Sequence, residues 1–431
     1  MRVDRLQPLL RQLLRQLRKP RPLTQAALEL LNAVNGLHPI SRNPYISVYE
    51  FWSGWPTSEV PQFYLAASVL DALRRGRRGD FAGPKGRAAL ALTAAAWAVL
   101  GAIRYLGATT PGPVLEAGLT DELGTDYADE LNKLPTQPTR SGRRSLPMRT
   151  YMSRRLYVDK TNVVSYGPHR RANRADIWRR RDLPRDGKAP VLLQVPGGAW
   201  MIGMRRPQAY PLMGHLTARG WVCVSIGYRV SPLHTWPDHI VDVKRALAWV
   251  KENLAQYGGD PDFVAITGGS AGGHLSALAA LTPNDPKFQP GFEDADTSVV
   301  AAVPMYGHSD WFSTDGPGRR QFVRIIEMFV VKRRLSKNRD IYVDASPIRQ
   351  VSADAPPFFV LHGQDDSLIP VVEGQKFVQE LRAVSKSPVA YAELPYAQHA
   401  FEMFDSPRAH KVAEAVARFL SWVYVTNPPT R

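Results

Sequence analysis

The chain has 431 residues, of which 44% are hydrophobic and 22% charged, and its formal net charge is +16. Residues 1–190 hold 31 Lys and Arg against 16 Asp and Glu, whereas residues 191–431 hold 24 against 23. The positive charge therefore belongs to the front of the chain. Because an enzyme of nucleic acids carries its positive field around its active site, the neutral second half argues against a nucleic-acid partner.

The first hundred residues predict helices, some of them suited to lipid. Residues 5–18 place leucines on one helical face and arginines elsewhere, which is typical of a basic helix on an anionic membrane or of a terminal helix packed on its own domain. Residues 88–103 contain one polar residue, Thr93, and lie at the lower length limit of a membrane span. A buried helix of a small helical domain is the alternative. We do not expect a cleavable signal peptide.

These features divide the chain into three parts. Residues 1–108 are expected to form a basic, mainly helical region that either anchors the chain to a membrane or packs as a helical domain. Residues 109–148 are rich in Pro, Gly, Thr and acidic residues without a sustained period, which predicts a linker. If residues 88–108 crossed a membrane, the basic residues within 74–87 would stay cytoplasmic, and the residues that follow 108 would lie in the cell envelope. Without that crossing we expect a cytoplasmic protein.

From about residue 149 onward, runs typical of strands alternate with runs typical of helices. Strands are expected at 162–166, 175–179, 190–195, 221–228, 263–267, 299–305, 357–362 and 389–393. Helices are expected at 208–219, 240–257, 271–281, 371–384 and 408–424. This alternation predicts an α/β domain over 149–431, with a mostly parallel sheet covered on both faces. The alternation lapses at about 307–350, which predicts a cap inserted over the carboxyl ends of the strands.

A glycine-flanked serine lies at the centre of this domain. The apolar run Val264-Ala-Ile-Thr267 leads into Gly268-Gly-Ser270-Ala-Gly272, and a helix-forming run follows. Strand, Gly-x-Ser-x-Gly and helix together form the context of a nucleophile elbow, in which a strained turn exposes the serine Oγ. A glycine-rich turn or phosphate loop is the alternative for this motif alone.

Two later loops supply the partners that a serine nucleophile needs. A base must take the serine proton and a carboxylate must orient that base. An apolar strand ends at Gly363-Gln-Asp365-Asp366-Ser-Leu-Ile-Pro370, and the last strand is followed by Gln398-His399-Ala-Phe401. Ser270, Asp366 and His399 therefore occur in the chain order serine, acid, histidine. Asp365 competes for the acid position, and the pattern Gly-x-x-Asp-x-Leu-x-Pro selects Asp366.

The strand at 190–195 ends in Pro196-Gly197-Gly198-Ala199-Trp200, where small residues let backbone N–H groups approach a reacting carbonyl. This position, two strands before the elbow strand in the chain, is where the second set of oxyanion-hole donors is expected. We also expect Gly197 and Trp200 of this loop to contact substrate.

Residues 149–425 resemble the hormone-sensitive-lipase branch of the α/β-hydrolases, and within it the mycobacterial Lip-type carboxylesterases. The motifs that carry the resemblance are Pro-Gly-Gly-Ala-Trp at 196–200, residues 236–249, Tyr-Gly-Gly-Asp-Pro-Asp at 257–262, Gly-Gly-Ser-Ala-Gly-Gly-His at 268–274, Asp366, and Gln-His-Ala-Phe at 398–401. The chain departs from the family's His-Gly-Gly-Gly at 196–199, which puts the rigidity of that loop in doubt. It also has Gly269 where the family usually has aspartate, so the orientation of substrate is expected to differ.

The resemblance implies an α/β-hydrolase fold and a serine carboxylesterase or lipase that works through an acyl-enzyme. It makes Ser270 the nucleophile, His399 the base and Asp366 its partner, and it makes the N–H groups of Gly198, Ala199 and Ala271 the oxyanion hole. No metal or cofactor is implied, and the expected partners are a small-molecule or lipid ester and a membrane surface. The alternatives are an amidase, a sugar-ester deacetylase, or a catalytically dead binding protein.

Overall fold

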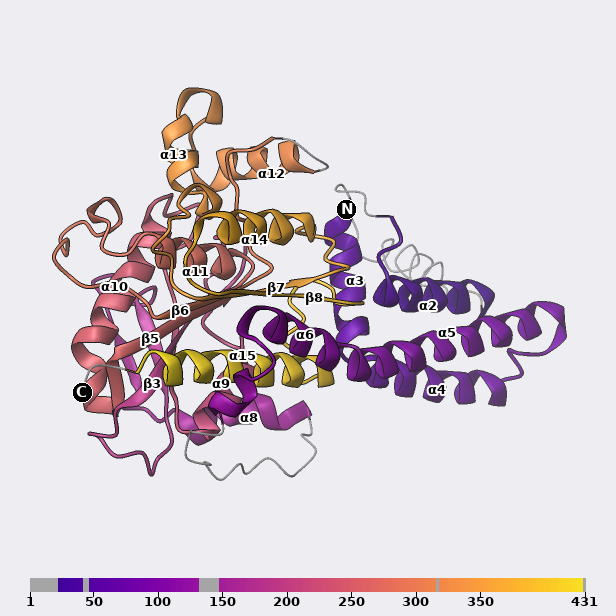
Figure 1. Ribbon diagram of the computed structural model, residues 1–431. Helices are drawn as coiled ribbons and strands as arrows, with labels where there is room; N and C mark the ends of the chain where they lie inside the picture. Colours follow the sequence, from indigo (N-terminus) through magenta and orange to yellow (C-terminus); the bar gives the residue numbers. More distant parts are fainter. Residues whose placement is uncertain (1–21, 42–45, 132–146, 315–317, 429–431) are drawn as a thin grey trace, which may run out of the picture.

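The protein is described by a computed structural model that covers residues 22–41, 46–131, 147–314 and 318–428 (Figure 1). The amphipathic helix expected at 5–18 lies outside the described residues. Both the sheet and its helical cover lie C-terminal to residue 146, with the first helices projecting from them.

An eight-stranded sheet forms the centre of the α/β domain, in the order β1-β2-β4-β3-β5-β6-β7-β8. The six strands from β4 to β8 in this order are parallel, whereas β1 and β2 are antiparallel at one edge. The strands are β1 (Val163–Ser165), β2 (Arg174–Trp178), β3 (Ala189–Val195), β4 (Val222–Ile226), β5 (Gly259–Gly269), β6 (Ala301–Met305), β7 (Phe358–Gly363) and β8 (Val389–Leu394). They confirm the eight strands and the mostly parallel sheet expected from the sequence.

Helices cover both faces of this sheet (Figure 1). One face carries α10 (Asp238–Asn253), α11 (Ala271–Leu281) and α14 (Val372–Val384), and the other carries α8 (Pro147–Tyr157), α9 (Tyr210–Ala218) and α15 (Pro407–Thr426). Strand β3 shows why two cores form: Val191 and Leu193 enter one hydrophobic cluster, and Leu192, on the opposite face, enters the other. The alternation of side chains along a strand thus feeds both layers.

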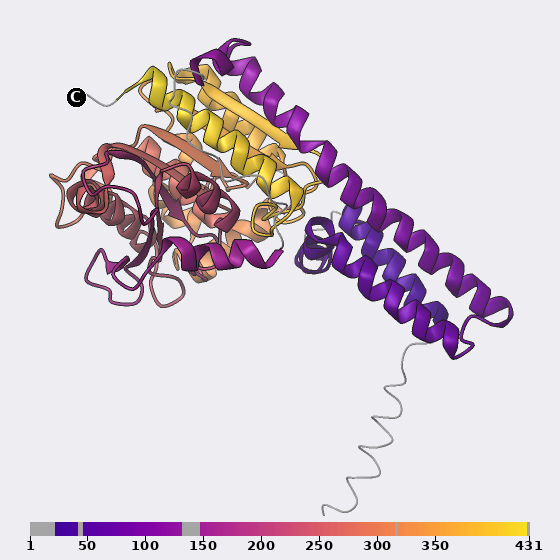
Figure 2. The same ribbon diagram turned by 90° about the horizontal axis from the view of Figure 1, so that it is seen from below.

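The described residues up to 109 form the helices α2 (Pro22–Leu37), α3 (Ser47–Glu59), α4 (Pro61–Arg77) and α5 (Gly83–Thr109). Helices α2, α4 and α5 lie side by side and project from the domain as an elongated arm (Figure 2). The apolar helix expected at 88–108 is α5. Pro61 occupies the first position of α4, where its missing N–H would have had no partner within the helix.

The linker expected at 109–148 is wrong for residues 111–131, which form α6 (Pro111–Leu123) and α7 (Tyr127–Leu131). Pro111 and Pro113 lie in the first turn of α6, where proline is tolerated. Leu115 and Leu119 are buried in the same cluster as β8 and α15 side chains, and Glu122 Oε1 accepts a hydrogen bond of 2.8 Å from the N–H of Val389. Helix α6 therefore flanks the edge of the sheet and does not act as a spacer.

The lapse expected at 307–350 contains short helices: α12 (Arg319–Ile325), a π-helical turn at Ile326–Val330, and α13 (Arg339–Asp344). They lie above the face that carries α14 (Figure 1). The remaining short elements are the 3-10 helices Leu254–Tyr257, Pro286–Phe288, Leu335–Lys337 and Pro347–Arg349. The Trp236 N–H donates to the Val330 carbonyl at 2.9 Å, which fixes the inserted segment to the entry of α10.

Candidate active site

Ser270 lies between the end of β5 and the start of α11, in the strained turn that the sequence predicts. Its φ of 58° and ψ of −123° are rare for a residue with a side chain, and strain of this kind is common at functional sites. A Cβ on Gly272 would lie closer than 3.0 Å to the Val195 carbonyl, so only glycine lets α11 approach β3 here. Ala271 opens α11, where backbone N–H groups have no partner within the helix.

Asp366 and His399 are brought into direct contact. Asp366 Oδ2 accepts from His399 Nδ1 at 2.6 Å, and both side chains are buried. Asp366 Oδ1 accepts from the N–H groups of Leu368 and Ile369, at 2.9 and 2.8 Å. The carboxylate is thus oriented by its own loop, and it leaves the Nε2 atom of the imidazole free of this contact.

Asp365 points to a different partner. Its Oδ1 lies 2.6 Å from Nδ1 of His38, in the segment between α2 and α3, so Asp365 pairs with the N-terminal region. Of the two aspartates in this loop, Asp366 is the one that contacts the histidine, as the sequence pattern predicts.

The loop at 196–200, for which the sequence predicts oxyanion-hole donors, passes beside the serine: a Cβ on Gly197 would lie 3.2 Å from the Ser270 Cβ. Gly198 and Ala199 have positive φ values, 128° and 52°. Gln208 holds the loop, because its Oε1 accepts from the Gly197 N–H at 2.6 Å and its Nε2 donates to the Gly197 carbonyl at 3.2 Å. Tyr228 Oη donates to the Pro196 carbonyl at 3.0 Å. Gln208 and Tyr228 thus supply the bracing that the missing histidine put in doubt.

Gly197 and Trp200, which we expected to contact substrate, have other contacts. The Gly197 N–H is used by Gln208. The Trp200 indole is 4% exposed, and its Nε1 lies 3.1 Å from His274 Nδ1. Trp200 is therefore a core side chain that supports the loop from beneath. The sequence could not distinguish a substrate contact from a core position for Trp200, since an aromatic residue shortly after a glycine pair fits both.

His274 is a buried support of the elbow helix that the sequence left without a role. Its Nε2 lies 2.7 Å from the Ala345 carbonyl, at the end of α13, and its ring stacks on Trp311 with centroids 4.5 Å apart. Burial lowers the pKa of His274 to about 3, so the ring is neutral. It joins α11 to the inserted segment.

The histidine loop is also held by its own Gln398 and by side chains of α3. Gln398 Oε1 accepts from the N–H of His399 at 2.9 Å and from the N–H of Ser367 at 2.7 Å, so it ties the histidine loop to the acid loop. From α3, Trp55 Nε1 donates to the Ala400 carbonyl at 2.8 Å, and the Phe51 ring lies 5.7 Å from His399. The N-terminal region therefore contributes to the wall of the site.

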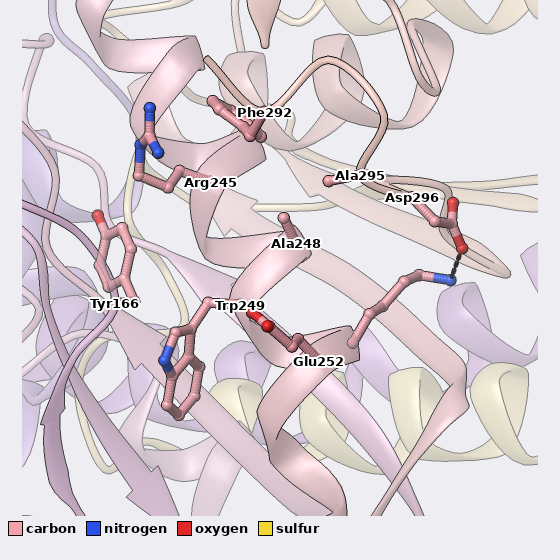
Figure 3. Close-up of a pocket in the computed structure, with 9 residues that line it drawn as sticks. Tyr166, Arg245, Ala248, Trp249, Glu252, Phe292, Ala295 and Asp296 are labelled. Atoms are coloured by element: carbon pink, nitrogen blue, oxygen red, sulfur yellow. Dashed lines mark ion pairs between the residues drawn. The ribbon is translucent and has the colours of Figure 1, made fainter. Parts of the chain in front are cut away.

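A separate groove of about 530 Å³ lies along α10, away from these loops (Figure 3). Its charged groups already have partners: Lys251 pairs with Asp296 at 2.6 Å, and the Arg245 guanidinium lies over the Phe292 ring at 4.2 Å. We therefore do not assign chemistry to it. Within the described parts of the chain, no group of three or more His, Cys, Asp or Glu side chains is placed to hold a metal ion.

Comparison with known proteins gives relatives that are esterases. A family model described as BD-FAE matches residues 177–381. The probable carboxylic ester hydrolase LipM of Mycobacterium tuberculosis is 48% identical over 412 residues, which cover 94% of each chain. Esterase LipQ of the same organism is 50% identical over 319 residues, covering 72% of this chain and 74% of LipQ.

Solved structures share the fold at lower identity. A truncated carbohydrate esterase from gut microbiota has a TM-score of 0.52 at 22% identity, and covers 61% of this chain and 97% of its own. Esterase Est2 of Thermogutta terrifontis, in its butyrate-bound form, also has a TM-score of 0.52 at 22% identity, and covers 62% of this chain and 96% of its own. These two support the fold alone. Because LipM matches over nearly the whole of both chains, this protein belongs to the LipM family of carboxylic ester hydrolases, in the hormone-sensitive-lipase branch of the α/β-hydrolases.

Proposed function

We propose that Ser270, His399 and Asp366 are the catalytic triad of this ester hydrolase, and that the N–H groups of Gly198, Ala199 and Ala271 form its oxyanion hole. The observation that carries the proposal is the 2.6 Å contact between Asp366 and His399, in loops that end two strands of the sheet that presents Ser270. The relatives are esterases, which favours ester hydrolysis over the amidase and the dead binding protein, whereas a sugar-ester deacetylase would itself be an ester hydrolase.

The chemistry follows from this arrangement. With its Nδ1 proton held by Asp366, His399 presents an unprotonated Nε2 that takes the Ser270 proton as Oγ attacks the ester carbonyl. The three backbone N–H groups stabilise the oxyanion, and the imidazolium then gives its proton to the leaving alcohol. In the second half of the reaction, His399 takes a proton from water as the water attacks the acyl-enzyme. His399 then gives that proton to Ser270 Oγ, which releases the carboxylic acid and restores Ser270.

The test is Ser270→Ala, which should lower ester turnover on the order of a million-fold with an unchanged melting temperature. A fluorophosphonate probe should label the wild-type protein at Ser270 and leave the variant unlabelled. Turnover within tenfold of wild type, or labelling of the variant, would contradict the assignment.

We further propose that the arm formed by α2, α4 and α5 contacts membrane lipid. Its helices pack through small residues together with Leu100 and Ile103, and other large apolar side chains are exposed. The buried residues of α5 include Gly86, Ala89, Thr93 and Ala96. The exposed residues of the arm include Leu28, Leu31, Phe63, Leu70, Leu73 and Leu90. Small residues at helix contacts are typical of membrane bundles, and an apolar exterior suits hydrocarbon better than water.

Length and charge support the same proposal. The stretch Gly83–Leu123, which comprises α5 and α6, contains a window apolar enough to cross a membrane, and 28% of that window is buried, unlike the core helix of a soluble protein. At about 1.5 Å per residue, α5 is roughly 40 Å long, which exceeds a bilayer core of about 30 Å. The far end of the arm carries Arg74, Arg77, Arg78, Lys85 and Arg87. Cationic residues favour the cytoplasmic side, so the catalytic domain would lie in the cell envelope.

Fractionation tests this location. Full-length protein should stay with membranes after washes in high salt and in carbonate, and the triple change of Leu70, Leu73 and Leu90 to Glu should release it. Leu156→Glu is the matched control, since Leu156 is equally exposed but lies on α8 of the catalytic domain. Recovery of the wild-type chain in the soluble fraction would remove the proposal and leave a cytoplasmic esterase.

A further inference from the structure

The side chain of Tyr306 occupies the space beside the nucleophile that Gly269 leaves open. Gly269 ends β5 and Tyr306 follows β6, the neighbouring strand. A Cβ on Gly269 would lie closer than 3.0 Å to both Oη and Cζ of Tyr306. Glycine at 269 and tyrosine at 306 are therefore matched, and no side chain fits at 269 unless the phenol moves.

The same phenol ring packs against the imidazole of His399. The ring centroids are 4.6 Å apart with an interplanar angle of 61°, and the Phe51 ring lies 5.7 Å from the imidazole at 82°. Contacts of this edge-to-face kind are stabilising and depend on orientation. With Asp366 on Nδ1, the imidazole is thus fixed by two rings and one carboxylate.

Glu402 holds Tyr306 in this position. The Tyr306 hydroxyl donates to Oε2 of Glu402, which lies three residues after His399 in the same loop and is 5% exposed. Burial raises the pKa of Tyr306 well above 10, so the phenol keeps its proton and remains a donor. Burial also raises the pKa of Glu402, while the Tyr306 hydrogen bond and the nearby His399 lower it. A carboxyl group with few other polar neighbours is costly to bury, which makes this bond its main compensation.

We infer that Tyr306 and Glu402 are positioning residues for His399. The phenol fixes the plane of the imidazole, and the Glu402 carboxylate holds the phenol and favours the imidazolium that forms during the reaction. This inference rests on the proposed triad. The other charged groups around the imidazole are Asp366 on Nδ1, His362 at 3.7 Å from Asp366, and the buried Glu59–Arg408 pair at the end of α3.

The test uses Tyr306→Phe, which removes the hydroxyl and keeps the ring, and Glu402→Gln, which removes the charge. Either variant should lower kcat about tenfold with KM within twofold, below the hundredfold that an ångström of misplacement costs. The Glu402 anion, which favours the imidazolium, is lost in Glu402→Gln. The acid limb of kcat/KM should therefore move to lower pH. Tyr306→Phe should move the acid limb in the same direction. Without the Tyr306 hydroxyl that donates to it, Glu402 takes up a proton more readily and loses its charge.

Tyr391→Phe is the matched control, since Tyr391 Oη donates to Glu393 Oε2 at 3.3 Å on β8, and it should leave the acid limb in place. An unchanged acid limb in Tyr306→Phe, or the same shift in Tyr391→Phe, overturns the inference. If Glu402→Gln fails to fold, Tyr306→Phe alone decides. Fluorophosphonate labelling of the wild type separates the two proposals. No labelling at Ser270 refutes the triad. Labelling at Ser270, together with variants whose kcat and acid limb match the wild type, refutes only the positioning by Tyr306 and Glu402.

Discussion

Replacing Asp366 with Asn tests the orientation of the imidazole, and the structure determines which way the new amide must face. Oδ1 of Asp366 accepts from the N–H groups of Leu368 and Ile369, and an amide nitrogen cannot accept there. The amide oxygen of the variant therefore keeps that place, and its NH₂ group faces His399 Nδ1. This leaves Nδ1 unprotonated and moves the ring proton to Nε2, the atom that must accept the Ser270 proton. The expected loss in kcat is about ten-thousand-fold, or about 5.4 kcal/mol.

Asp365→Asn is the matched comparison, because it changes the neighbouring residue in the same loop. Asp365 pairs with His38, so its replacement leaves the contact between Asp366 and His399 in place. We expect a loss of a few-fold at most. The assay is hydrolysis of a short p-nitrophenyl ester, with melting temperatures to confirm folding. A larger loss from Asp365→Asn than from Asp366→Asn would refute the assignment of the acid.

Three further predictions concern the loops, the inserted segment and acid stability. Gln208→Ala removes both hydrogen bonds to Gly197, so kcat should fall about 10- to 100-fold with little change in folding, measured on the same ester. Met328→Lys places a charge on an exposed apolar residue of the inserted segment, and it should lower hydrolysis of long-chain esters more than that of acetyl esters. Uniform loss over all chain lengths would indicate a packing role. Burial lowers the pKa values of His215 and His274 to about 3 and that of His239 to about 4. The unfolded chain thus binds these protons first, so the free energy of unfolding should fall by up to about 1.4 kcal/mol per histidine for each pH unit below about 6.5, seen as a falling melting temperature. A melting temperature that stays constant down to pH 5 would contradict this.

The strands of the catalytic domain could be predicted because their signals are local. Most are short apolar runs bounded by glycine, proline or charge, and helix-like runs separate them. The elbow, the acid loop and the histidine loop could be predicted for the same reason, since each motif follows its own strand directly.

The N-terminal helices could not be predicted with the same rules. Pro56 lies inside α3, and α6 opens with Pro111 and Pro113, so the local composition indicates loops. What stabilises α6 is the burial of Leu115 and Leu119 against side chains of β8 and α15, nearly 300 residues later in the chain. Tertiary contacts here override local preference.

The residues that brace the site were also beyond prediction. Gln208, Tyr306 and Glu402 act through partners that folding brings near, and none of them lies in a motif around Ser270. The departure at Gly269 was visible in the sequence, but its counterpart, Tyr306, could be identified only once β5 and β6 were seen as neighbours. A motif reports the groups that react, whereas their supports are distributed over the fold.

Helix α3 joins the arm to the chemistry. Its last residue, Glu59, pairs with Arg408 and accepts from Ser406 Oγ at 2.7 Å, at the start of α15 and within the loop that follows His399. Removing one partner of a buried ion pair costs about 3–5 kcal/mol, so separating α3 from the catalytic domain would require a comparable free energy. The same helix places Phe51 against the imidazole and leads, one residue later, into α4 of the arm. Helix α3 therefore connects the arm to a segment whose Phe51 ring contacts His399.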